Sequence, residues 1–246
     1  MRKLVIPISL GLMCASFTII PAAKTAPSPV EAAGVSHPII TDFTKSTVAA
    51  GAEVYAVANL QSYGLSEEAF NYAWKGYQKL LEENKLSRTN YLTICDFSQS
   101  SRQKRLYIID VVNQQLITNT YVAHGKNSGA EYATSFSNKP ESLQSSLGFY
   151  ITAQTYIGEH GLSLRINGVD PGYNDKALAR TIVIHGAVYV DAARAKAGMY
   201  MGRSWGCPAV PQKESGTIIT TIKNGTCLFI YHPGKAYLFG SKILNG

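Results

Sequence analysis

The feature that most constrains the fold is a series of short, β-rich runs that follow Asn90 and are separated by turn residues at even spacing. Runs of this length and composition fit the pleated, half-buried surface of a sheet. Strands are expected at 106–112, 116–122, 148–152, 162–166, 181–185 and 226–231, the first two forming a hairpin around 113–115. Such spacing is typical of an all-β sandwich or barrel, so the fold class expected is mainly β.

Helices are expected on either side of this β-rich part. Between 66 and 83, Ser66 can cap a helix, and Leu65 and Phe70 have the spacing of a hydrophobic staple. The apolar residues of this helix fall on one face and are expected to pack in the core: Phe70, Trp74, Tyr77 and Leu81. A second helix is expected over 212–223, ended by Asn224-Gly225.

The N-terminus has the pattern of a secretory signal peptide. Met1-Arg2-Lys3 precedes an apolar run over 4–20, and Pro21-Ala22-Ala23 follows it. Cleavage at Ala23 or at Ala32 fits the pattern. An uncleaved anchor is the alternative, although the run is short for a membrane span and is broken by Pro7. With no other long apolar segment, no stable membrane insertion is expected after cleavage.

The expected organisation is therefore a signal peptide over 1–32, a linker and helical segment over 33–89, and a catalytic domain over 90–246. Export predicts the periplasm or the cell wall as the location. Cleavage near Ala32 would lower the formal charge from +7 to +5, and such a mildly basic exported protein suits anionic wall polymers or simply has a solvated basic surface. Nucleic acid is disfavoured because no dense Lys/Arg stripe is present.

Three cysteines follow the apolar run, and they differ in context. Cys95 and Cys227 lie in strand-like runs and are expected to be inert core residues, or to be bonded to each other. Cys207 lies in a loop between Gly206 and Pro208. An unpaired loop cysteine in an exported protein requires a chemical explanation.

A histidine precedes that cysteine by 22 positions, at the end of the apolar run Ile182-Val183-Ile184-His185-Gly186. A thiol is a weak nucleophile until it loses its proton, and a neighbouring imidazole is the usual group that accepts it. Gly206 would let the backbone approach closely, so that N–H groups around Cys207 could hold a tetrahedral oxyanion. The pair therefore predicts cysteine acyl transfer with His185 as base.

The same residues resemble a known family. His185-Gly186 followed by Ser204-Trp205-Gly206-Cys207 is similar to the His-Gly and Ser-His-Gly-Cys motif of the L,D-transpeptidase (YkuD-type) catalytic domain. Ser146-Leu147-Gly148-Phe149-Tyr150 resembles that family's Thr-Pro-x-Gly-x-aromatic strand entry. The resemblance covers roughly 90–237. It departs from the common motif at Trp205, which replaces a histidine, and at Ala209, where an arginine is frequent.

The resemblance implies a β-sandwich catalytic domain whose partners are peptidoglycan stem peptides. Cys207 would attack the carbonyl between the diamino acid and the terminal D-alanine, and an amine of a second stem would resolve the thioester into a 3-3 crosslink. Water in place of that amine would make the enzyme an L,D-carboxypeptidase. A non-catalytic module that binds wall peptides is the third alternative, favoured by the substitutions at Trp205 and Ala209.

Stem peptides carry carboxylates, so cations are expected at the site. Arg165 and Arg203 are the candidates because guanidinium binds carboxylate with two hydrogen bonds, although a surface ion pair is the competing role for each. Trp205 is expected to wall the pocket. Ser204 is expected to fix the loop by hydrogen bonding rather than to take part in chemistry.

Two other histidines and two other kinds of site fit the sequence less well. His124 ends an apolar strand before a glycine and is the rival base, whereas His160 fits a polar turn better than a cleft wall. A sortase would need an arginine after the cysteine motif, and no arginine follows Arg203. No metal site or cofactor is expected, because the histidines lack zinc-site spacing and no phosphate-binding glycine loop occurs.

Overall fold

The computed structural model describes residues 50–201 and 203–246. The expected signal peptide over 1–32, with its cleavage site and Cys14, lies outside the described residues, as does most of the linker that follows. Among the residues that are described, no helix is long and apolar enough to span a membrane.

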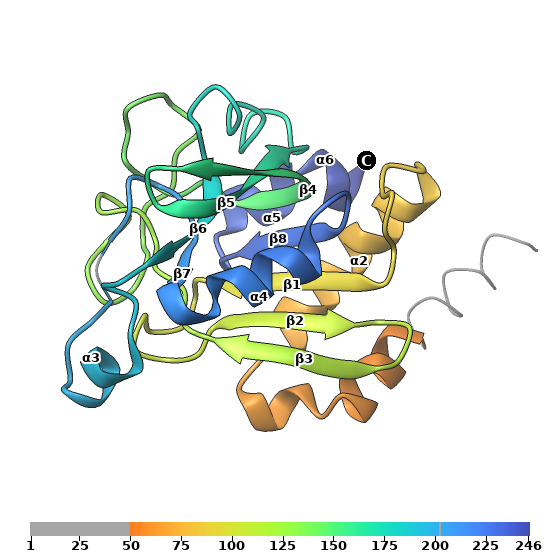
Figure 1. The fold of residues 1–246 in the computed structure, drawn as a ribbon. Coiled ribbons are helices and arrows are strands. Elements are labelled where there is room, and N and C mark those ends of the chain that lie inside the picture. Colours follow the sequence, from red (N-terminus) through yellow and green to blue (C-terminus); the bar gives the residue numbers. More distant parts are fainter. Residues whose placement is uncertain (1–49, 202) are drawn as a thin grey trace, which may run out of the picture. The chain divides into compact units, whose positions relative to one another are not determined.

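One mixed sheet of eight strands forms the centre of the described chain, in the order β3-β2-β1-β8-β4-β5-β6-β7 (Figure 1). Two neighbouring pairs, β1 with β8 and β6 with β7, are parallel, and the others are antiparallel. The strands are β1 (Tyr91–Asp96), β2 (Leu106–Asp110), β3 (Gln115–Thr120), β4 (Gly148–Gly158), β5 (Gly161–Gly168), β6 (Val183–Ala187), β7 (Ala209–Pro211) and β8 (Cys227–Tyr231).

The six predicted strands are confirmed, with shifts at their ends. The hairpin of β2 and β3 forms as predicted, whereas β4 continues six residues beyond the predicted end at Thr152. β6 begins at Val183 and not at Thr181, because Thr181 has a φ of 53° that leaves the extended region. The mainly β class with a helical N-terminal segment is confirmed.

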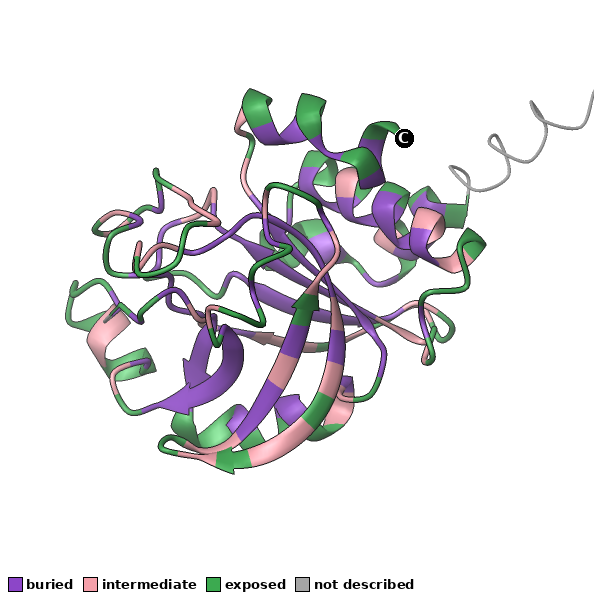
Figure 2. Ribbon diagram, turned by 90° about the horizontal axis from the view of Figure 1, so that it is seen from above, coloured by how far each residue is buried: buried purple, intermediate pink, exposed green. Residues whose placement is uncertain are grey.

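The helix predicted over 66–83 is α2 (Glu67–Glu82), and the Ala69 N–H donates to the side chain of Ser66 as a cap at 3.1 Å. Before it lie helical residues 50–57 and the 3₁₀ helix η1 (Leu60–Tyr63). α2 contacts β1 and β8, whereas α4 (Gln212–Ile222) contacts β5, β6 and β7. The two helices lie on opposite sides of the sheet (Figures 1 and 2).

Burial is concentrated in the strands and in the inner faces of these helices, as Figure 2 shows. Phe70, Trp74 and Tyr77 of α2 are buried as predicted. Cys95 and Cys227 lie in the neighbouring strands β1 and β8, fully buried, and both thiols are free. The bond between them that the sequence left open is absent, and their role is core packing.

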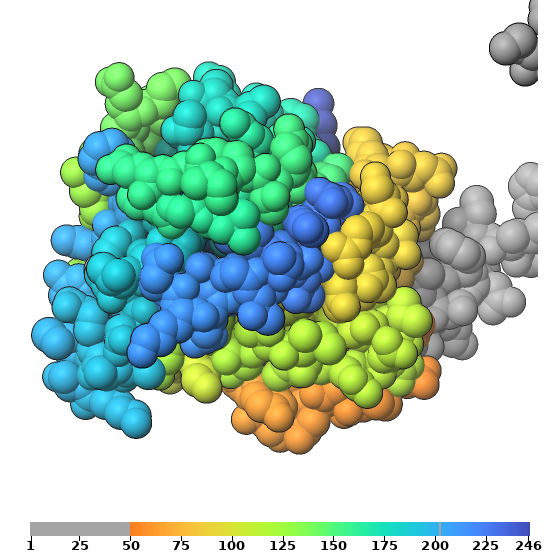
Figure 3. Space-filling model, viewed as in Figure 1, coloured from red at the N-terminus to blue at the C-terminus, as the bar shows by residue number. Residues whose placement is uncertain are grey.

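Short helices complete the fold, and the strand pattern predicted none of them. α3 (Ala192–Lys196) lies between β6 and β7 and projects from the end of the sheet (Figures 1 and 3). α5 (Lys235–Gly240) and α6 (Lys242–Asn245) end the chain. The buried carboxylate of Asp170 accepts hydrogen bonds from the Tyr237 hydroxyl at 2.8 Å and the Ser241 hydroxyl at 2.6 Å, which ties these helices to the end of β5.

Substitution of Gly76 on α2 would test the contact between this helix and the sheet. A Cβ at this position would lie 2.0 Å from the ring of Phe149, so Gly76→Ala must displace a buried aromatic side chain. We expect the free energy of unfolding to fall by about 1–3 kcal/mol in urea titration. Gly216→Ala on α4 is the matched control, because a Cβ there meets no atom within 4 Å. Helix propensity alone should raise the stability of that variant by up to about 1 kcal/mol, and an equal loss in both would refute the packing argument.

Candidate active site

A cavity of about 850 Å³ opens at the end of the sheet where β6 and β7 meet. Its walls come from the loop between β3 and β4, from the turn of the β4–β5 hairpin, from the segment that enters β6, and from the loop that precedes β7. The lining residues are Pro140, Glu141, Leu143, Tyr156, Glu159, His160, Ser163, Ala179, Arg180, Thr181, Ile182, Val183, His185, Tyr189, Arg203, Ser204, Trp205 and Cys207.

The register of β6 and β7 brings the predicted pair together. His185 pairs with Ala209 in the parallel ladder, two residues after Cys207. Cys207 itself lies in the loop before β7, and its Sγ lies 3.8 Å from the Thr181 carbonyl oxygen at the entry to β6. His185 and Cys207 both line the cavity.

The environment of His185 fixes its protonation state. Its Nδ1 lies 2.9 Å from the Gly186 carbonyl oxygen, which can only accept, so Nδ1 carries the hydrogen and Nε2 has a free lone pair. Burial lowers the pKa of His185, although the Gly186 carbonyl opposes the shift, and the nearby His160 lowers it further. The ring is thus neutral at pH 7 and suited to accept a proton.

His160 stacks on that imidazole with ring centroids 4.3 Å apart, and it lines the same cavity. The sequence favoured a polar turn for this residue. It does lie at the turn between β4 and β5, but the pairing of Ser163 with His185 brings that turn over the site. His160 is therefore part of the cavity wall.

Cys207 is half-buried and is held as a thiol in the resting site. Its Sγ donates a weak hydrogen bond to the Thr181 carbonyl oxygen at 3.8 Å. Burial raises the pKa of Cys207, while the Val183 N–H, the Arg180 guanidinium and its own N–H act in the opposite direction. The site does not hold a preformed thiolate, so a base must remove the proton when substrate arrives.

Ser204 and Gly206 shape the loop that carries Cys207. The Ser204 hydroxyl donates to the Cys207 carbonyl oxygen at 2.5 Å and accepts from the Gly206 N–H at 3.1 Å. Gly206 has a φ of 125°, and a Cβ there would lie 2.7 Å from the Gln144 carbonyl oxygen. The loop-fixing role expected of Ser204 agrees with these bonds. The Gly206 N–H is already engaged, which leaves the N–H groups of Cys207 and Val183 beside the sulfur.

Arg180 was missed by the sequence analysis. Its guanidinium donates to the Ser137 and Gln144 carbonyl oxygens at 2.7 and 2.6 Å and to the hydroxyls of Ser146 and Ser142 at 2.5 and 3.1 Å. All four acceptors are neutral, and none of the ion pairs in the described parts of the chain includes Arg180. Arg180 therefore locks the loop between β3 and β4 over the site and keeps a cation near Cys207.

Of the predicted substrate-binding residues, some line the cavity and one does not. Arg203 and Trp205 line it, and Trp205 is 73% exposed. Arg165 does not line it, because its guanidinium packs over the Tyr156 ring at 4.6 Å, and Tyr156 is the residue that faces the cavity. Arg165 thus contacts a cavity-lining residue without lining the cavity itself.

Backbone strain also gathers at this cavity. Glu141, Leu143 and Thr181 all have φ between 53° and 58°, a region that residues of these types rarely adopt. Thr181 presents the carbonyl that accepts from Cys207, and the other two belong to the loop that Arg180 holds. These strained positions are maintained by the hydrogen bonds around the site.

The rival base, His124, lies outside the cavity. It is fully buried, with Nδ1 2.8 Å from a guanidinium nitrogen of Arg105, which is also fully buried. Burial, reinforced by that cation, lowers the pKa of His124 to about 4. Its carbonyl oxygen accepts from the Ser204 N–H at 3.0 Å, so His124 supports the cysteine loop from behind.

Comparison with solved structures gives distant similarities. The L,D-transpeptidase LdtMt1 in complex with imipenem is 10% identical, with 58% of this chain and 59% of that one covered and a TM-score of 0.36. An L,D-transpeptidase from Mycobacterium smegmatis is 9% identical over the same shares, with a TM-score of 0.36. A fused Zn-dependent amidase/peptidase/peptidoglycan-binding protein from Clostridium acetobutylicum is 15% identical over 63% of this chain and 61% of that one, with a TM-score of 0.35. The matched part spans about three fifths of these chains, and no curated protein sequence matches.

Comparison with protein families gives a match across most of the fold. The family model of the L,D-transpeptidase catalytic domain matches residues 61–231. That range runs from η1 to the end of β8 and includes every strand, together with His185 and Cys207. The chain belongs to the L,D-transpeptidase catalytic domain family.

Proposed function

We propose that this chain is a peptidoglycan L,D-transpeptidase that forms an acyl-enzyme on Cys207 and makes 3-3 crosslinks. The observation that carries the proposal is that β6 and the loop before β7 direct a neutral imidazole and a half-buried thiol into one cavity. That combination of nucleophile and base is what acyl transfer at neutral pH requires.

In the first step, His185 Nε2 accepts the proton of Cys207 as the sulfur attacks the carbonyl carbon between the diamino acid and D-alanine. The tetrahedral oxyanion would be stabilised by the N–H groups beside the sulfur and by the charge of Arg180. His185 then gives its proton to the leaving nitrogen, the C–N bond breaks, and D-alanine departs. A thioester between the stem and Cys207 remains.

In the second step, the side-chain amine of another stem attacks the thioester carbon. His185 accepts a proton from that amine and returns it to sulfur as the C–S bond breaks. A new amide bond joins two diamino acids, and the thiol is regenerated. If water attacks instead, the same residues give a tripeptide, which is carboxypeptidase activity.

The proposed binding roles are divided by position. Arg203 would bind a substrate carboxylate, and Trp205 would cover the bound stem, because both line the cavity. Arg165 would act on the stem only through Tyr156, on which it packs. For the reaction to occur, the chain would be exported, with 1–32 removed, and would work in the periplasm or the cell wall.

Product analysis tests the proposal. Purified protein is incubated with tetrapeptide fragments of peptidoglycan, and the products are compared with those of Cys207→Ala by mass spectrometry. We expect loss of D-alanine and new 3-3 dimers with the wild type only. Tripeptide without dimers would make the chain a carboxypeptidase. Unchanged fragments with folded, reduced protein would favour a non-catalytic binding module.

A further inference from the structure

A second cavity, of about 640 Å³, is lined in part by α3 and by the segment that follows it. Its lining residues are Lys126, Arg194, Gly198, Met199, Tyr200 and Arg203. Arg203 lines both cavities, so the two adjoin at this residue. The second cavity is called the basic cavity below.

The basic cavity is lined by three cations and by no acidic residue. The ion pairs found in the described parts of the chain join Lys79 and Lys85 to Glu83 and Arg102 to Glu131, so none of them neutralises these three side chains. Cations gathered without counterions attract an anionic ligand and bind it most strongly in a recess, where water screens less.

The cations are held in place by neutral groups. Lys126 Nζ lies 5.8 Å from the centre of the Trp205 ring, and the Arg203 guanidinium lies 5.5 Å from that of Tyr200. Arg203 also donates to the Gly129 carbonyl oxygen at 2.8 Å. Such contacts orient a cation but leave most of its hydrogen-bonding capacity free for a ligand. The Arg194 Nε is buried and has no hydrogen-bond partner in the part of the chain that the structure describes.

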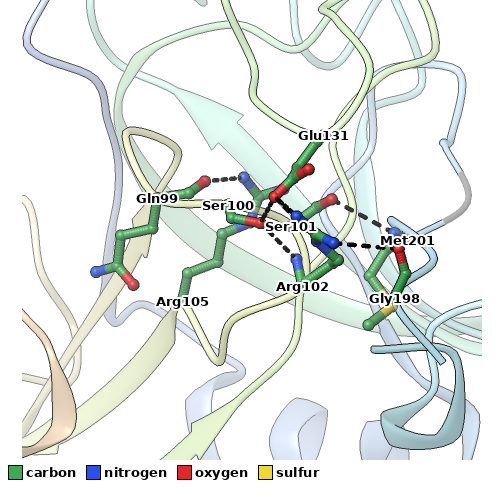
Figure 4. A network of polar contacts seen from close by, with 8 residues as sticks. All are labelled: Gln99, Ser100, Ser101, Arg102, Arg105, Glu131, Gly198 and Met201. Atoms are coloured by element: carbon green, nitrogen blue, oxygen red, sulfur yellow. Dashed lines mark hydrogen bonds and ion pairs between the residues drawn. The ribbon is translucent and has the colours of Figure 1, made fainter. Parts of the chain in front are cut away.

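A polar network, drawn in Figure 4, holds the segment after α3, and this segment forms part of the wall of the basic cavity. Arg102 forms an ion pair with Glu131 and also donates to the Gly198 carbonyl oxygen at 3.1 Å. Glu131 accepts in addition from the Ser100 hydroxyl, and the Met201 N–H donates to the Ser101 hydroxyl at 3.3 Å. The segment after α3 is thus tied to the loop between β1 and β2. A wall fixed in advance lowers the cost of ordering the site when ligand binds.

We propose that the basic cavity binds a carboxylate of the acceptor stem peptide, the second substrate of the crosslinking reaction. The inference rests on the proposed function. Once a donor stem occupies the first cavity as a thioester, the attacking amine must come from a neighbouring site, and the basic cavity adjoins the first through Arg203. Stem peptides carry several carboxylates, which matches three unpaired cations.

Acceptor kinetics test the assignment. In Lys126→Gln/Arg194→Gln, we expect the acceptor concentration for half-maximal dimer formation to rise at least about tenfold, because two charged contacts to the acceptor carboxylate are lost. The rate at which a tetrapeptide donor acylates Cys207 should stay within about twofold. Lys213→Gln, an exposed cation on α4 away from both cavities, is the matched control. An unchanged acceptor dependence would overturn the proposal, as would an equal loss in donor acylation.

Binding to an inactive protein separates this proposal from the proposed function. The stem tripeptide L-Ala-γ-D-Glu-meso-diaminopimelate is titrated into Cys207→Ala by calorimetry, with and without the two substitutions. Weaker binding in the substituted protein supports the carboxylate subsite even if the wild type forms no crosslinks. Equal binding, in a protein whose wild type does form dimers, refutes the subsite alone. If polyglycerol phosphate binds and the tripeptide does not, the cavity is assigned to an anionic wall polymer, and the proposal is overturned.

Discussion

His185→Gln is expected to lower the rate of Cys207 acylation by a donor tetrapeptide by about 10²–10⁴-fold. Glutamine can maintain a polar contact near the Gly186 carbonyl, but it offers no basic nitrogen to the thiol. Because burial raises the pKa of Cys207, almost none of the thiol ionises unaided at pH 7. The loss should therefore shrink as pH rises toward the thiol pKa, where hydroxide replaces the base. Stopped-flow acylation between pH 6 and pH 10 measures this convergence.

His160→Gln is the control for this experiment. His160 stacks on the imidazole and lowers the pKa of His185, but it takes no part in proton transfer in the proposed mechanism. Its replacement should raise the pKa of His185 and shift the acidic limb of the pH–rate profile to higher pH. The loss in the maximal rate should be far smaller than in His185→Gln. A His160 variant as slow as His185→Gln at every pH would contradict the assignment of the base.

Arg180→Gln should also reduce acylation, by about 10²-fold, because it removes both a cation beside the reacting sulfur and the lock on the loop over the cavity. Without that cation the pKa of Cys207 must rise, since the thiolate loses an attractive charge while the thiol does not. Alkylation of the folded protein by iodoacetamide, followed against pH, should show a midpoint displaced upward.

Arg180→Lys separates charge from positioning. Lysine keeps the cation but cannot make the four hydrogen bonds of the guanidinium to the loop. We expect its alkylation midpoint to stay near that of the wild type while the acylation rate remains low. Lys213→Gln controls for a general change in charge. If the midpoint is unmoved in Arg180→Gln, then Arg180 has only a structural role.

The fold was predictable where the signal is local. The cap at Ser66 and the apolar stripe of α2 depend on residues within a few turns of each other, and the β2–β3 hairpin depends on its own turn. α5 and α6 escaped prediction because they are short and depend on Asp170, a residue about 70 positions away. Thr181 shortened β6 because the hydrogen bonds around the cavity hold a backbone conformation that its side chain does not favour.

The site was predictable only in part, because some of its contacts join residues that are far apart in the sequence. Cys207 and His185 have a recognisable spacing, and the sheet register brings them together. Arg180 has no motif, because its role comes from acceptors 34 to 43 positions earlier in the chain. Arg165 lies outside the cavity lining because its guanidinium packs over the Tyr156 ring, a contact across the β4–β5 pair that composition does not reveal.

The central claim is that Cys207 carries the acyl group, and intact-protein mass spectrometry tests it most directly. The protein is mixed with a donor tetrapeptide and quenched in acid within seconds, and peptide mapping then locates any adduct. We predict a mass increase equal to the donor minus D-alanine, located on Cys207, with Cys95 and Cys227 unmodified because both are buried and no adduct in Cys207→Ala. An unmodified Cys207 in folded, reduced protein that still releases D-alanine would contradict the account.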